Sequence, residues 1–143
     1  MFIGEYRHTI DSKKRLALPV KFRRELGKTT VITRGLDNCL IVYPLKEWKV
    51  MSDKLGKLPA SQEEARGFAR IMLAGAMAVN LDKLGRILIP DYLKKYAHLK
   101  KNVVICGLFN RLEIWDVPEW ETYKEKMERG VGDLASKLKE LGI

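Results

Sequence analysis

Two short segments of the chain share a pattern of residues suited to the recognition of anions or bases. Residues 9–19 read TIDSKKRLALP and residues 80–90 read NLDKLGRILIP. Each segment has an aspartate, an arginine four positions later, three apolar residues and a proline: Asp11, Arg15 and Pro19 in the first copy, and Asp82, Arg86 and Pro90 in the second. A guanidinium group presents a rigid fork of donors that fits a carboxylate, a phosphate or the edge of a guanine. The two arginines are therefore the first candidates for a binding surface.

Three interpretations of the repeated Asp and Arg pair are open from the sequence. In the first, Asp11 and Asp82 cap their own turns and pair with the arginine of the same segment, which stabilises an exposed turn by only about 0–1 kcal/mol. In the second, the pairs join neighbouring subunits. In the third, Arg15 and Arg86 bind DNA and the aspartates orient them. We assign the arginines to DNA and give the aspartates a mainly structural role, within or between subunits.

The turns inside the two segments differ at one position. Gly85 suits a positive φ, whereas the first copy has Lys14 at that place. The first turn must therefore hold a non-glycine residue at positive φ or take a different shape. Lysines beside the arginines are suited to the phosphate backbone, so Lys13, Lys14 and Lys83 join the candidate DNA-binding residues.

Positive charge is concentrated at the beginning of the chain. The sequence has 27 Lys and Arg residues against 18 Asp and Glu, a net charge of +9. Residues 1–34 contain nine basic and three acidic side chains, a net charge of +6, whereas residues 116–143 contain five basic and seven acidic ones, a net charge of −2. Such a distribution is typical of a surface that binds a polyanion. Arg7, Arg23 and Arg24 complete the candidate DNA-binding set.

The similarity of the two segments extends over some forty positions and indicates internal duplication. With one gap, ten identities align in order, and seven follow the repeated segment: Val31, Gly35, Leu36, Asn38, Leu40, Glu47 and Trp48 match Val103, Gly107, Leu108, Asn110, Leu112, Glu119 and Trp120. Short apolar strands, turns and prolines alternate with brief helices in each copy. One small unit cannot cover its own sheet, so the copies should interlock. We predict a mainly β fold with short helices (α+β), a β-barrel with an internal pseudo-twofold axis.

The sequence also predicts how the two repeats are connected. We divide the chain into a first repeat at 1–57, a linking helix at 58–79 and a second repeat with a C-terminal helix at 80–143. Ser61 and Glu64 have the spacing of a capping box, which predicts a helix over about 62–76. Leu134, Leu138 and Leu141 form an apolar stripe that we expect to pack on the core of the chain; contact with a neighbouring subunit is the alternative.

Enzymatic, metal-binding and membrane functions find little support. Gly27, Lys28 and Thr29 are like the end of a phosphate-binding loop, but Phe22 occupies the place of its first glycine. The two cysteines and two histidines lie far apart, which does not predict a zinc site. The apolar run 71–79 is too short for a bilayer, and the N-terminus lacks the apolar core of a signal peptide. We expect a cytoplasmic, nucleoid-associated protein that is not an enzyme and needs no cofactor or metal.

These features together resemble the MraZ family of bacterial proteins. The resemblance rests on the methionine–phenylalanine start, the paired DxxxR segments with their apolar residues and proline, the linking segment RGFARIMLAGA and the phrase DKLGRILIP. It implies a swapped-hairpin, or double-split, β-barrel like those of AbrB-type transition-state regulators, with both units in one chain. It also implies a sequence-specific DNA-binding transcriptional regulator of the bacterial cell-division and cell-wall gene cluster. Such a regulator acts at its own promoter, forms a ring-shaped homo-oligomer and reads short direct repeats in double-stranded DNA.

Two other functions are alternatives to this one. A basic barrel could bind RNA, although Tyr6, Tyr43 and Trp115 are isolated rather than arranged as a platform for stacked bases. The chain could also form a ring-shaped scaffold whose charge is incidental. Salt-dependent binding to promoter DNA separates the DNA-binding and RNA-binding functions from the scaffold. Competition with RNA separates DNA binding from RNA binding.

Overall fold

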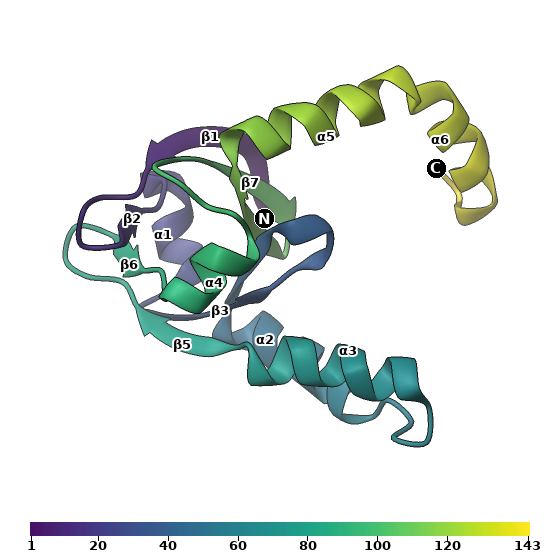
Figure 1. Ribbon diagram of the computed structural model, residues 1–143, viewed down its shortest axis with the longest axis horizontal. Coiled ribbons are helices and arrows are strands. Elements are labelled where there is room, and N and C mark those ends of the chain that lie inside the picture. The colour runs from purple at the N-terminus through teal and green to yellow at the C-terminus, as the bar shows by residue number, and fades with distance from the viewer.

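The two copies of the repeat fold into the same order of elements. The structure is a computed structural model that describes residues 1–143 (Figure 1). The first copy contains β1 (Phe2–Thr9), β2 (Arg15–Ala17), α1 (Val20–Leu26), β3 (Thr29–Arg34), the short η1 (Leu36–Asn38), β4 (Leu40–Pro44) and α2 (Leu45–Gly56). After α3 (Glu63–Ala74), the second copy contains β5 (Met77–Asn80), β6 (Arg86–Leu88), α4 (Asp91–Tyr96), β7 (Asn102–Phe109), β8 (Arg111–Asp116) and α5 (Val117–Arg129). The chain ends with α6 (Val131–Leu138) and η2 (Lys139–Leu141).

The two copies exchange strands with each other. β1 of the first copy pairs with β7 of the second, β5 of the second pairs with β3 of the first, and β2 and β6 pair with one another. The antiparallel sheet has the order β1-β7-β8-β4-β3-β5, which is unchanged when the copies are exchanged and the order is reversed. A pseudo-twofold axis therefore relates the halves. The predicted swapped-hairpin barrel with short helices is confirmed.

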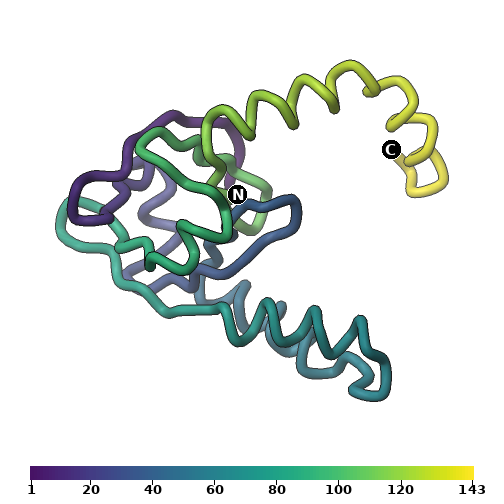
Figure 2. Tube along the Cα trace, viewed as in Figure 1, coloured from purple at the N-terminus to yellow at the C-terminus, as the bar shows by residue number.

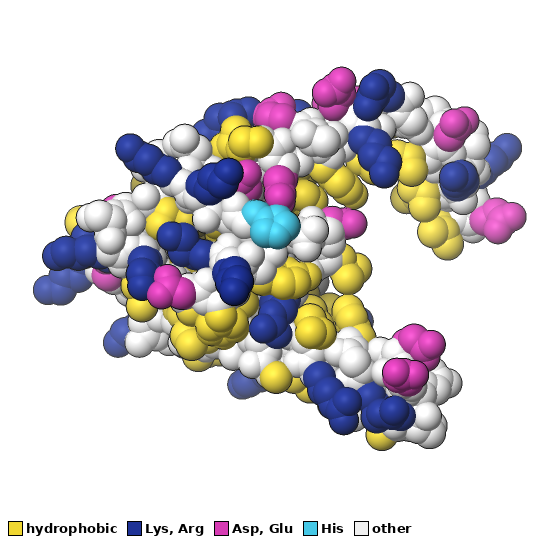
Figure 3. Space-filling view, in the orientation of Figure 1, with side chains coloured by type: hydrophobic (Ala, Val, Ile, Leu, Met, Phe, Trp, Pro, Cys, Tyr) yellow, Lys and Arg dark blue, Asp and Glu magenta, His cyan; other side chains and the backbone are white.

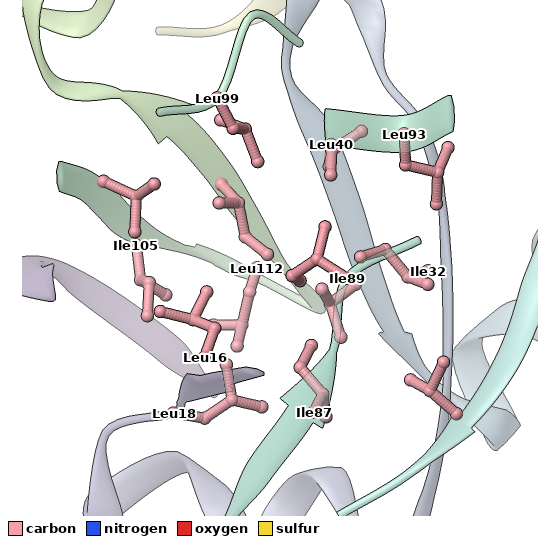
Figure 4. Packing of buried hydrophobic residues seen from close by; sticks show 14 of the residues in the cluster. Leu16, Leu18, Ile32, Leu40, Ile87, Ile89, Leu93, Leu99, Ile105 and Leu112 are labelled. Carbon is pink, nitrogen blue, oxygen red and sulfur yellow. The ribbon is translucent and has the colours of Figure 1, made fainter. Parts of the chain in front are cut away.

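One apolar core lies between the six-stranded sheet and the β2–β6 ribbon. It contains 19 buried residues from both copies. Leu16 and Leu18, in and just after β2, meet Ile87 and Ile89, in and just after β6. Ile105 and other side chains of the sheet lie opposite them (Figure 4). Because these side chains are withdrawn from water together, burial of the ribbon and formation of the barrel are coupled.

Aromatic residues attach a helix to the outer face of the sheet in each copy. Trp48 of α2 packs against Tyr43 of β4, with ring centroids 5.8 Å apart. Trp120 of α5 packs in the same way against Trp115 of β8, at 5.2 Å. The two tryptophans therefore have equivalent roles, as their alignment predicts.

Two helical arms project from the barrel on the side away from the β2–β6 ribbon (Figures 1 and 2). α2 and α3 form one arm and α5 and α6 form the other. The 13 residues of α5 extend over about 20 Å, and only its first half, through Tyr123, lies against Trp115. The prediction that Leu134, Leu138 and Leu141 pack on the core of their own chain is wrong, since α5 carries them beyond it. None of the three belongs to a core cluster, and Leu138 and Leu141 are 40% and 75% exposed.

The predicted linking helix is present, although slightly shorter than about 62–76 and without the predicted cap. α3 covers Glu63–Ala74, and no side chain caps its N-terminus, so the predicted capping box is wrong. The Gln62 N–H donates to the Pro59 carbonyl at 3.1 Å, which places Ser61 inside a separate turn. β5 begins at Met77 and pairs with β3. The division into 1–57, 58–79 and 80–143 stays a prediction.

The two copies differ in length at two places rather than one. Two residues, Gly27 and Lys28, separate α1 from β3, whereas residues 97–101 separate α4 from β7. The turn after β7 is in compensation shorter than the η1 turn after β3. Val31 and Val103 are consequently not equivalent, because Val103 faces the core while Ile32, rather than Val31, does so in β3.

Candidate nucleic-acid interface

Arg15 and Arg86 lie on the outer face of the β2–β6 ribbon. The ribbon pairs Arg15 with Leu88, Leu16 with Ile87, and Ala17 with Arg86. Leu16 and Ile87 are fully buried, and successive side chains of a strand point to opposite faces, so both arginines point outward. They are diagonal neighbours on one face, a relation that places such residues about 7–8 Å apart. The fold thus brings together two residues that are 71 positions apart in sequence.

An aspartate fixes each arginine in the same way. Asp11 Oδ1 accepts hydrogen bonds from the backbone N–H groups of Lys13 and Arg15, both at 2.9 Å, and Oδ2 accepts from Arg15 Nε at 2.8 Å. These bonds, led by that from the Arg15 backbone, lower the pKa of the Asp11 carboxyl below its ordinary value. Arg15 is thereby held through Nε, while its terminal Nη groups make no hydrogen bond within the chain.

The second copy repeats this arrangement. Asp82 Oδ1 accepts from the backbone N–H groups of Leu84 and Arg86 at 2.9 Å, and Oδ2 accepts from Arg86 Nε at 2.7 Å. Hydrogen bonding, led by that from the Arg86 backbone, lowers the pKa of Asp82 as well. The predicted capping of each turn and its local ion pair are both present, and an aspartate that holds Nε leaves the end of the guanidinium available to a ligand.

Loop 11–14 precedes β2 and loop 82–85 precedes β6, and each loop is hydrogen-bonded to the residue just after the other strand. The Leu18 N–H donates to the Gly85 carbonyl at 3.0 Å, and the Ile89 N–H donates to the Lys14 carbonyl at 2.8 Å. Both loops lie at the left end of the molecule in Figure 2. Of the two possibilities for the first turn, Lys14 at positive φ is the one present: its φ of 64° is close to the 72° of Gly85.

The other predicted DNA-binding residues do not all lie in these loops. Lys13 and Lys83 are exposed at the loops and have no ion-pair partner. Lys14 Nζ binds Asp91 Oδ2 of α4 at 2.7 Å. Arg23 lies over Gly85, where an added Cβ would come within 2.1 Å of Arg23 Nε, and it donates to the Leu18 carbonyl at 2.9 Å.

Arg7 and Arg24 are placed differently. The Arg7 guanidinium forms an ion pair with Glu121 of α5, outside the two loops. Arg24 is exposed on α1 and makes no ion pair. Their assignment to DNA stays a prediction.

Three lysines missed by the sequence analysis face loop 11–14. Lys94, Lys100 and Lys101 line an open cleft together with residues 9–12. Figure 3 shows basic side chains gathered over the end of the molecule that carries the loops. Lys100 and Lys101 follow α4 as a basic pair in the sequence, but only the pairing of β1 with β7 brings them to the first loop.

The structure contains no group of His, Cys, Asp and Glu residues that could hold a metal ion. Cys39 and Cys106 are free and buried, and burial raises the pKa of the Cys106 thiol to about 12. None of the helices is both long and apolar enough to span a bilayer.

Comparisons with known proteins agree with the internal repeat. Two matches to the family model described as "MraZ protein, putative antitoxin-like" cover residues 1–71 and 72–138. The chain belongs to the MraZ family. Proteins named Transcriptional regulator MraZ are similar to it over the full length of both chains: 48% identical in Alkaliphilus metalliredigens, 47% in Clostridium tetani and 49% in Caldicellulosiruptor saccharolyticus. The resemblance seen in the sequence to MraZ proteins is thus confirmed.

Proposed function

We propose that this chain is a transcriptional regulator that binds double-stranded DNA in a sequence-specific way through the outer face of the β2–β6 ribbon. The observation that carries the proposal is that Arg15 and Arg86 stand side by side with their terminal nitrogens free. The names of the MraZ relatives support the regulatory function.

The dimensions and chemistry of the ribbon suit the major groove. That groove admits a two-stranded β-ribbon, and an arginine fork there donates to O6 and N7 of a guanine. Asp11 and Asp82 hold the guanidinium groups before DNA arrives, which lowers the entropy lost on binding. Lys13 and Lys83, at the loops beside the arginines, are suited to the flanking phosphates.

Assembly into a ring-shaped homo-oligomer belongs to the proposal. Apolar side chains are exposed on both arms, among them Phe68 and Ile71 of α3 and Val131 and Leu138 of α6. Figure 3 shows hydrophobic side chains on the inner side of the arm formed by α5 and α6. Several subunits in a ring would present several ribbons to DNA, and linked sites of this kind raise the overall affinity.

The target proposed is the promoter of the chain's own gene, within the cell-division and cell-wall gene cluster, with short direct repeats as the recognised element. The protein would then act in the cytoplasm, at the nucleoid. This target comes from the resemblance to the MraZ family, and the ribbon supplies the chemistry of base recognition.

A binding competition tests the proposal. Fluorescence anisotropy would be measured with a duplex from upstream of the gene, an unrelated duplex of the same length and base composition, and an RNA of the same length. We expect salt-dependent binding that is much tighter to the upstream duplex than to the unrelated duplex or the RNA. Equal binding to both duplexes would refute sequence specificity, preference for RNA would favour the RNA-binding alternative, and no binding would favour the scaffold.

A further inference from the structure

A basic cleft lies next to loop 11–14. It is open, has a volume of about 640 Å³ and is lined by residues of the two copies: Thr9, Ile10, Asp11, Ser12, Lys94, Lys100 and Lys101. The first four belong to the end of β1 and the loop that holds Arg15. The three lysines come from the last turn of α4 and the segment before β7.

The segment that carries the lysines is held firmly against the barrel. The Leu99 side chain is 6% exposed and belongs to the core, and its N–H donates to the Lys94 carbonyl at 2.9 Å. The Ile10 N–H donates to the Lys101 carbonyl at 2.8 Å, next to the pairing of Thr9 with Asn102. The backbone positions of the lysines relative to the loop are therefore fixed by buried packing and by the sheet.

The three lysines of the cleft form no ion pair within the chain. No carboxylate forms an ion pair with Lys94, Lys100 or Lys101. Asp11 is the one acidic residue that lines the cleft, and both of its oxygens already accept hydrogen bonds from its own loop. Asp91, one turn before Lys94 on α4, is paired with Lys14. Three lysines that line one cleft and form no ion pair favour an anion at this place.

None of the larger clefts of the molecule lies beside loop 82–85. At the pseudo-twofold position beside loop 82–85, Arg23 and Lys28 take the places of the cleft lysines. The Arg23 guanidinium, however, packs over Gly85 and donates to the Leu18 carbonyl. The additional residues before β7 provide the longer segment that carries Lys100 and Lys101. The two halves of the interface are thus unequal in charge although they are similar in backbone.

We propose that the cleft formed by Lys94, Lys100 and Lys101 binds the phosphate backbone of the DNA strand next to the bases contacted by Arg15. This inference rests on the proposed function. Because the cleft occurs on one side of the pseudo-twofold axis, it gives the chain a defined orientation on DNA. Lysine contacts to phosphate add affinity without base preference and release counterions.

The test compares two triple variants that remove the same charge. Lys94→Ala, Lys100→Ala and Lys101→Ala removes the positive charge of the cleft, whereas Lys49→Ala, Lys54→Ala and Lys57→Ala changes lysines on the arm that points away from the loops. Binding to the upstream and unrelated duplexes would be measured over a range of salt concentrations. Circular dichroism and light scattering would verify that both variants keep the fold and assembly of the parent.

We expect the cleft variant to bind both duplexes more weakly, by roughly fivefold per lysine at about 0.15 M salt, with the slope of log K against log salt reduced by about 0.9 for each phosphate that is no longer neutralised. The arm variant should retain the slope of the parent. Equal slopes for the parent and both variants, or an equal decrease of affinity in both variants, would refute phosphate binding by the cleft. Either result would leave the proposed function intact. A parent protein that does not prefer the upstream duplex would instead refute the proposed function.

Discussion

At the scale of single residues, each aspartate of the DxxxR segments serves both the loop and the arginine. Asp11 and Asp82 each accept two backbone hydrogen bonds and one from an arginine Nε. The sequence predicts this capping, because aspartate commonly bonds the backbone two residues later. It does not predict Lys94 beside Asp11, since that proximity depends on strand exchange.

The lowered pKa values of the two aspartates predict a pH-dependent contribution to stability. A depressed carboxyl pKa stabilises the folded state above the ordinary value of about 3.9, and this contribution is lost as the pH falls through the folded-state pKa. Asp11→Asn with Asp82→Asn should lower Tm at pH 7, and the difference from the parent should shrink below about pH 4. Thermal unfolding at equal protein concentration measures it. A difference in Tm between variant and parent that is the same at pH 7 and pH 3 would contradict a stabilising role of the ionised aspartates.

At the scale of elements, the ribbon and its loops depend on both copies. The sequence predicts the strands, the turns and their repetition from apolar periodicity and proline. It does not reveal that β2 pairs with β6, and it misaligns Val31 with Val103, because an insertion before β7 and a shorter turn after it cancel in part. Identities in sequence cannot separate these two changes when both adjoining strands are apolar.

Gly85 should be the most sensitive position of loop 82–85. An alanine there would hold a positive φ of 72° and its Cβ would collide with Arg23. We expect Gly85→Ala to reduce the free energy of unfolding by at least about 1–2 kcal/mol. Gly132→Ala, in α6 with open space around it, is a matched control that should have no such cost. Urea denaturation measures both, and equal stability of the two variants would contradict the left-handed conformation assigned to residue 85.

At the scale of the whole molecule, the end that carries loops 11–14 and 82–85 and the two apolar arms are separated. The loops lie at one end of the barrel and the arms project from the other side (Figure 1). The C-terminal leucines have the pattern of a core-facing helix, but periodicity does not say which core they face. In this chain α5 carries them away from the barrel, and we propose that they contact a neighbouring subunit.

Assembly should therefore depend on the C-terminal arm. Leu138→Ser with Leu141→Ser changes exposed residues, so the monomer fold should be retained while apolar contact between subunits is weakened. Light scattering should give a multiple of 16.4 kDa for the parent and a smaller species for the variant. A parent that is monomeric at micromolar concentration would contradict ring assembly, and an unchanged variant would exclude these leucines from the interface.

The most direct test of base recognition is a guanine footprint on the upstream duplex. Dimethyl sulfate methylates guanine N7, the atom to which an arginine fork donates in the major groove. The parent should protect guanines within the bound site. The double variant Arg15→Ala with Arg86→Ala should lose this protection. Its binding free energy should become less favourable by about 1–3 kcal/mol per arginine, and the variant would be verified as folded and assembled like the parent. Unchanged guanine protection in that double variant would contradict base recognition by the two arginines.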